Sequence, residues 1–353
     1  MMTLASLHQF GGSSIDVTVV QPSPYHYYSG MGPGMLGATY EPEQIRFDTR
    51  RQVERGGGTF IENTAVHIDP IRSSVTLADG STLSYDALSC NTGSQVAADI
   101  RGNRDEIIPA KPIAGLIAAR KRLTELIGRG AVHVGIVGGG PSAVELACNV
   151  RQLADRHDSS QVRITLFAGH RIFPGRPPCL QRIVKRYLAK RQITGIEESR
   201  IVSVSGGAVK TDRKQHHSCD LIFTATGVAP APMLRQSGLS TEQGSGLAVN
   251  RYLQSITYEN IFGGGDCIDF VSSPLDKVGV YAVRQNPVLL HNLLAFLNGR
   301  PLRPFSPGGG YLLVYNMGKG HGILAKGALI FSGRLAFVIK DYIDRRFMRA
   351  YRC

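Results

Sequence analysis

Short apolar runs alternate with amphipathic stretches along most of the chain, and the clearest pattern lies near its middle. Residues 132–137 form a near-continuous apolar run, which is typical of a parallel strand covered on both faces. A glycine turn at 138–140 follows, then a helical stretch to about Leu153 and a second apolar run at 162–167. This order predicts a β-turn-α-β unit of the size that binds a dinucleotide.

Related elements flank this unit on both sides. Residues 56–94 predict strands and hairpins, and a helix is expected at 113–127, ending near Gly128. The apolar runs that lead into Thr92-Gly93 and Thr226-Gly227 end in the same way. This repetition indicates two related nucleotide domains within an α/β fold.

The chain opens at an unusual point of this pattern. Residues 1–10 predict a short helix, and residues 16–20 predict a buried strand. An ordinary dinucleotide fold begins one element earlier, with a strand and its glycine turn. We therefore expect the first domain to lack its N-terminal strand and glycine turn.

The strongest local motif is the G-x-G-x-x-A turn after the strand 132–137. Gly138 permits the tight turn, Gly140 lets backbone approach a pyrophosphate, and Ala143 lets helix and strand pack closely. The free N–H groups at the start of the next helix, at Ser142 and its neighbours, favour a phosphate. The alternative is a purely structural turn, but the flanking strand and helix favour dinucleotide binding.

The second strand of this unit ends without the acidic residue that usually binds the NAD ribose. The segment after Phe167 contains His170 and Arg171 instead. Arg171 suits the 2′-phosphate of NADPH, and a surface arginine at a strand end is an equally good interpretation. We expect weak discrimination between NADH and NADPH.

A motif in the last third of the chain resembles one that is typical of a known family. Residues 261–264 are an apolar strand and glycine turn leading to Gly265 and Asp266. This segment resembles the late FAD motif of pyridine nucleotide-disulfide oxidoreductase-like flavoproteins, in which the Asp contacts FAD. The segments around Thr92-Gly93 and Thr226-Gly227 resemble two further motifs of that family, in the same order.

Within the family, the chain most resembles type II NADH dehydrogenases and apoptosis-inducing-factor-like oxidoreductases. It is still nearer to the flavoprotein domain fused to some selenide water dikinases. Four segments carry this similarity: 22–25, 29–31, 279–289 and 340–348.

The resemblance implies FAD and NAD(P)H as cofactors and hydride transfer from nicotinamide to flavin, with a quinone or another small molecule as acceptor. It implies an FAD-binding domain in two parts, 1–108 and 233–299, around an NAD(P)H-binding domain at 109–232, with an α+β cap at 300–353. It also places Glu145 near the nicotinamide and flavin, where a carboxyl group orients the amide or transfers a proton. Lys277 is expected to pair with a flavin carbonyl or with Glu145.

Two departures from the family pattern bear on FAD. The chain begins after the first glycine turn, and Gln21 stands where relatives carry the ribose-binding acid. A second interpretation is therefore a non-catalytic nucleotide-binding remnant. A third is a sulfur or selenium reductase, which needs a reactive thiol near the flavin. Cys179 is one candidate without an evident partner, and an incidental thiol is the simpler interpretation.

The amino-acid composition limits the classes of binding partner that we expect. The net charge of +13 favours polyanionic partners, such as phosphate-bearing cofactors and anionic lipid, and a solvated basic surface is an equally good interpretation. We find no nucleic-acid motif and no zinc-finger spacing, and expect neither a nucleic acid nor a metal. The six cysteines form no C-x-x-C pair, so a reducing cytoplasmic location is expected.

The C-terminal stretch predicts an amphipathic helix flanked by basic residues. Its apolar face consists of Leu335, Val338, Ile339, Tyr342, Ile343 and Phe347. Such a face suits either peripheral contact with the inner face of a membrane or docking on the protein's own core. We favour docking, because Asp341 and Asp344 interrupt the basic flank.

Overall fold

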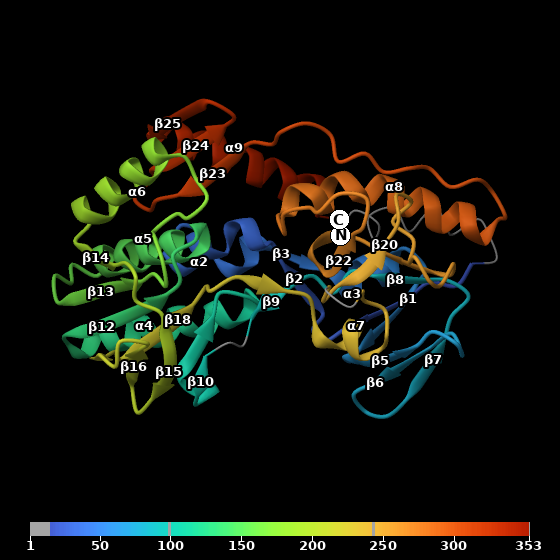
Figure 1. Cartoon of the computed structure of the whole chain (residues 1–353), viewed down its shortest axis with the longest axis horizontal. Helices are drawn as coiled ribbons and strands as arrows, with labels where there is room; N and C mark the ends of the chain where they lie inside the picture. Colours follow the sequence, from blue (N-terminus) through green and yellow to red (C-terminus); the bar gives the residue numbers. More distant parts are fainter. Residues whose placement is uncertain (1–14, 98–99, 242–243, 353) are drawn as a thin grey trace.

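The computed structural model describes residues 15–97, 100–241 and 244–352 (Figure 1). The predicted helix at 1–10 lies outside these residues. The chain folds into an NAD(P)H-type unit, on the left in Figure 1, an FAD-type unit on the right, and a C-terminal cap above them.

The NAD(P)H-type unit is built on a five-stranded parallel sheet in the order β11-β18-β12-β13-β14. The strands are β11 (Ile107–Pro109), β12 (Val132–Val137), β13 (Val162–Phe167), β14 (Ile193–Ile196) and β18 (Leu221–Thr224). The helices are α4 (Ala114–Arg129), α5 (Pro141–Arg156) and α6 (Pro178–Lys190). The middle strand of this sheet, β12, is buried along nearly its whole length, as its apolar sequence predicts.

The sequence prediction was close in this unit but missed some boundaries. The helix α4 continues past Gly128 and ends at Arg129, before Gly130, whose φ of +139° a residue with a side chain rarely adopts. The predicted domain boundary between residues 108 and 109 falls inside β11, which pairs with β18. A small sheet, β10-β15-β16-β17, flanks the unit: β10 (Arg101–Gly102), β15 (Ile201–Ser205), β16 (Ala208–Thr211) and β17 (His216–Ser218).

The FAD-type unit consists of short ladders. Parallel pairs join β1 (Thr18–Gln21) to β4 (Thr59–Glu62), β8 (Leu88–Cys90) to β21 (Ile261–Gly263), and β20 (Leu247–Val249) to β22 (Ile268–Phe270). A meander of β5 (Ala65–Asp69), β6 (Ser74–Leu77) and β7 (Thr82–Ser84) lies beside them, and β2 (Tyr25–Tyr27) pairs with β3 (Arg46–Asp48). Its helices are α3 (Thr49–Arg55), α7 (Pro232–Gln236) and α8 (Gly279–Leu297), whereas the short helix α2 (Gly32–Leu36) packs against α4 and α5 of the NAD(P)H-type unit. In the described part of the chain, the ladders β1-β4 and β8-β21 are not joined to each other.

The cap contains a three-stranded antiparallel sheet, β23 (Leu313–Asn316), β24 (Gly322–Lys326) and β25 (Leu329–Gly333), followed by α9 (Arg334–Tyr351). The face by which α9 docks differs from our prediction. Its buried residues are Ala336, Lys340, Asp344 and Met348. Most of the predicted apolar face is exposed: Leu335, Val338, Tyr342 and Ile343 are 66%, 58%, 60% and 43% exposed. The predicted docking face is therefore wrong, although Phe347 does pack against Tyr28 and Phe47.

Candidate functional site

The glycine turn between β12 and α5 is closed on one side and open on the other. Gly138 has φ +137°, and a Cβ atom there would lie 2.3 Å from the Ala225 carbonyl oxygen. At Gly140 a Cβ atom would meet nothing within 4 Å. The tight side packs on the strand β18, and the open side leaves room for a ligand to reach the backbone.

The start of α5 suits a phosphate. The N-cap residue is Gly140, so no side chain accepts the first N–H groups of the helix. Ser142 is exposed and Ala143 is fully buried beside Gly138. Free N–H groups and the positive end of a helix dipole stabilise an anion. The predicted pyrophosphate residues therefore come together in a form that fits a dinucleotide.

The loop that carries Arg171 lies against this turn. The Phe173 amide donates to the Gly139 carbonyl over 2.7 Å, and a Cβ atom at Gly139 would lie 2.7 Å from the Arg171 carbonyl oxygen. The Arg171 side chain is exposed, while His170 lies 3.7 Å from Glu198. Contact of Arg171 with a 2′-phosphate remains a prediction.

The two Thr-Gly turns lie side by side. Gly93 and Gly227 both have positive φ, +66° and +122°. The strands that follow them, β9 (Gln95–Val96) and β19 (Val228–Ala229), pair in antiparallel fashion. Thr92 and Thr226 are exposed beyond the ends of β8 and β18. Ligands of α/β proteins bind at such carboxyl ends of parallel strands.

Asp266 is the centre of a small polar cluster at the FAD motif. Its Oδ2 accepts hydrogen bonds from Ser94 Oγ at 2.7 Å and from Lys111 Nζ at 2.8 Å. The backbone there turns at Gly265, with φ +81°, whose amide donates to the buried Gln285 Oε1. Among the described residues, nothing donates to Asp266 Oδ1. A carboxylate with an oxygen to spare fits a ribityl hydroxyl.

Three residues of this cluster escaped the sequence prediction. Ser94 directly follows the Thr92-Gly93 motif, and Gln285 lies in the segment 279–289 that carries the family resemblance, so sequence reasoning could have found both. Lys111 has no such motif. It reaches Asp266, 155 residues further along the chain, only because of the fold.

Glu145 sits beside the C-terminal cap. Its Oε1 accepts the Asn316 amide over 2.7 Å. Burial raises the pKa of Glu145 to about 7, and the nearby Lys340 ammonium opposes that rise. Lys340 in turn donates to the Gly30 carbonyl at 2.7 Å and to Asp344 at 2.5 Å. A carboxyl with this pKa can hold or release a proton near neutrality.

Lys277 does not pair with Glu145, so that alternative is wrong. Its Nζ donates to Asp269 Oδ1 at 2.9 Å and to the Ile268 carbonyl at 2.5 Å. Asp269, in the middle of β22, also accepts hydrogen bonds from the amides of Ser245 and Gly246, which fixes the position of this pair. Contact of Lys277 with a flavin carbonyl remains a prediction.

The described cysteines are all free. Cys267 and Cys90 lie together near the FAD motif, but burial raises the pKa of both thiols. Cys179 is exposed at the start of α6. Because of these raised pKa values, Cys90 and Cys267 are poor candidates for the low-pKa thiolate that a sulfur or selenium reductase would need.

Known proteins share this architecture. The NDH2 of Plasmodium falciparum, solved in complex with NADH, superposes with a TM-score of 0.82 at 14% identity over 98% of this chain and 94% of that chain. The sulfide:quinone oxidoreductase of Aquifex aeolicus gives a TM-score of 0.80 at 18% identity over 99% and 89%. These likenesses confirm the predicted two-unit α/β fold.

Sequence relatives point the same way. The ferroptosis suppressor protein 1 of Taeniopygia guttata is 26% identical over 76% of this chain and 71% of its own length. A type II NADH:quinone oxidoreductase of Haemophilus influenzae is 27% identical over 51% of this chain and 44% of its own. The family model described as "Pyridine nucleotide-disulphide oxidoreductase" matches residues 3–292. The predicted oxidoreductase class and the cofactors FAD and NAD(P)H agree with these matches, and the chain belongs to the pyridine nucleotide-disulphide oxidoreductase family.

Proposed function

We propose that this protein is a flavoenzyme that oxidises NAD(P)H and passes the electrons to a quinone or a similar small acceptor. The observation that carries the proposal is the convergence of two nucleotide sites. The open turn at Gly140 and the Asp266 cluster belong to different units, and the paired Thr-Gly turns join them. Relatives named as NADH:quinone and sulfide:quinone oxidoreductases support a quinone as acceptor.

Each group has a defined task in this proposal. The start of α5 binds the NAD(P)H pyrophosphate, while Asp266 and the turn at Gly93 hold FAD. The flavin supplies the two-electron chemistry when it is bound. Glu145 holds a proton near neutral pH, because its pKa of about 7 is close to that of the medium.

The test is to purify the protein, incubate it with FAD and remove the excess. Retained flavin that is bleached anaerobically by NADH or NADPH and recovers on addition of a quinone supports the proposal. A protein that binds a nicotinamide nucleotide but never takes up flavin supports the remnant interpretation instead.

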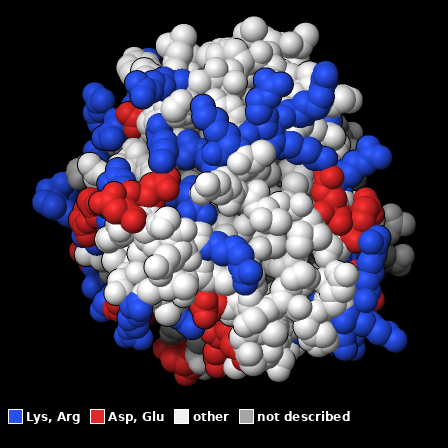
Figure 2. Space-filling view, turned by 90° about the vertical axis from the view of Figure 1, so that its left-hand side faces the viewer, with Lys and Arg blue, Asp and Glu red and all other residues white. Residues whose placement is uncertain are grey.

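We further infer that α9 makes peripheral contact with a membrane, where a lipid-soluble quinone resides. No helix in the described ranges is long and apolar enough to cross a bilayer. The exposed apolar residues Leu335, Val338 and Tyr342 form one side of α9, with Arg346 and Arg349 also exposed. The face shown in Figure 2, which is the left-hand side of Figure 1, also carries a band of Lys and Arg that adds to the protein's overall attraction to anionic surfaces. This combination suits an anionic lipid surface.

Sedimentation with vesicles tests this contact. The protein should bind vesicles that contain an anionic phospholipid, and Val338→Asp should release it. The matched control is Ile71→Asp, at an exposed apolar residue between β5 and β6, which should not release it. Equal binding of the Val338→Asp variant would exclude α9 as the contact.

A further inference from the structure

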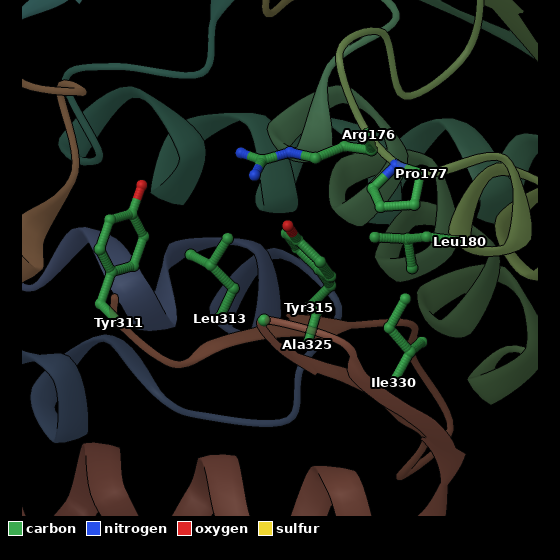
Figure 3. Close-up of a pocket in the computed structure, with 9 residues that line it drawn as sticks. Arg176, Pro177, Leu180, Tyr311, Leu313, Tyr315, Ala325 and Ile330 are labelled. Atoms are coloured by element: carbon green, nitrogen blue, oxygen red, sulfur yellow. The ribbon is translucent and has the colours of Figure 1, made fainter. Parts of the chain in front are cut away.

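A pocket of about 240 Å³ lies between the NAD(P)H-type unit and the cap (Figure 3). The start of α6 forms one wall, and the sheet β23-β24-β25 with the segment before it forms the other. Its apolar lining includes Leu180, Leu313 and Ile330. The volume lies below the roughly 300–1,000 Å³ of pockets for drug-sized ligands, so it suits one small ring system rather than a dinucleotide.

The polar groups of this pocket are donors. Figure 3 shows the Arg176 guanidinium extending across the pocket. The Tyr315 hydroxyl points toward the same side of the pocket as this guanidinium. Tyr315 is 4% exposed, and its hydroxyl has no hydrogen-bond partner among the described residues. Within the same residues, the Arg176 guanidinium makes no hydrogen bond or ion pair. Buried polar groups are normally satisfied, so this unmet donor marks a place for a ligand oxygen.

Residues that line the pocket contact neighbours of both parts of the proposed redox site. At one end, Tyr311 stacks edge-on against Tyr281 in the first turn of α8, with ring centroids 5.5 Å apart. A neighbouring residue of that turn, Ala282, lies 3.5 Å from the Cβ position of Gly265 in the FAD motif. At the other end, Asn316 directly follows Tyr315 and donates its amide to Glu145. A series of direct contacts therefore links the pocket to the FAD motif and to Glu145.

We propose that this pocket binds the ring of the electron acceptor, a quinone whose carbonyl oxygen accepts hydrogen bonds from Arg176 and Tyr315. The inference rests on the proposed function, because NAD(P)H is the reductant. NAD(P)H, one proton and the quinone give NAD(P)⁺ and the hydroquinone, so two electrons and two protons enter the ring carbonyls. Negative charge that develops on the carbonyl oxygen is stabilised by the guanidinium and the hydroxyl. The apolar wall, which includes Leu180, Leu313 and Ile330, contacts the ring.

Equilibrium binding of 1,4-naphthoquinone, followed by ligand-detected NMR without NADH, tests the pocket directly. Arg176→Gln and Tyr315→Phe should each raise the Kd about tenfold, the loss of one good hydrogen bond. Arg182→Gln is the matched control, because Arg182 is exposed on the same helix away from the pocket. It should leave the Kd unchanged. All three variants should keep the wild-type affinity for NADH and an unchanged melting temperature.

The outcomes separate this inference from the proposed function. If both pocket variants bind naphthoquinone as wild type does, yet NADH still reduces the protein's flavin, the pocket assignment fails and the proposed function stands. If naphthoquinone binding depends on Arg176 and Tyr315 but NADH never reduces flavin, the pocket stands as a ring-binding site and the proposed function fails. If inorganic phosphate displaces naphthoquinone and only phosphate binding is lost in Arg176→Gln, the pocket is an anion site and the inference is overturned.

Discussion

Two glycines of the same turn should respond in opposite ways to an added side chain. Gly140 has φ −77° and ψ 177°, which valine adopts freely, and nothing lies within 4 Å of its Cβ position. Gly140→Val should therefore fold normally and project its side chain into the path of the pyrophosphate. We expect NADH affinity to fall by at least about a hundredfold, near 2.7 kcal/mol.

Gly138→Ala is the counterpart. Its φ of +137° disfavours any side chain, and the new Cβ would lie 2.3 Å from the Ala225 carbonyl oxygen. Strained backbone of this kind costs about 1–3 kcal/mol, so this variant should lose stability. Fluorescence titration with NADH and urea unfolding of both variants check the pair. Normal NADH binding by Gly140→Val would refute the reasoning, because the turn would then be structural.

Three further results are expected. Burial raises the pKa of Glu145 from 4.5 to about 7, so the protonated carboxyl stabilises the fold at low pH, and this stabilisation is lost as pH rises through that range. The melting temperature should therefore fall between pH 5 and pH 8, and Glu145→Gln should make this fall smaller. Arg171→Ala should weaken NADPH more than NADH, and a wild-type preference for NADH above about a hundredfold (2.7 kcal/mol) would contradict the nucleotide prediction. Lys340→Met leaves the buried Asp344 carboxylate without its ion-pair partner, so the free energy of unfolding measured in urea should fall by about 3–5 kcal/mol. Arg346→Met, on the exposed side of the helix, should change it little.

Sequence predicted the NAD(P)H-type turn well because its signal is local. The strand β12, the three glycines and the start of α5 occupy consecutive positions, and each has a distinct physical requirement. The same holds for the two Thr-Gly turns, which lie at the ends of apolar strands.

Partners that are distant in sequence could not be predicted in this way. Asn316 and Lys340 lie 171 and 195 positions after Glu145, and only the docking of the cap brings them to it. The prediction for α9 failed for a related reason. Periodicity marks an apolar face but does not specify what covers it. This helix instead docks through small and paired polar residues, because Lys340 and Asp344 satisfy each other when buried.

Anaerobic reduction of the FAD-loaded protein tests the central claim most directly. The visible absorbance of bound flavin should disappear on addition of stoichiometric NADH or NADPH and return when a quinone is added, and Gly140→Val should block the first step only. Flavin that stays oxidised in the presence of excess NADH and NADPH, in a protein that binds both, would contradict the account.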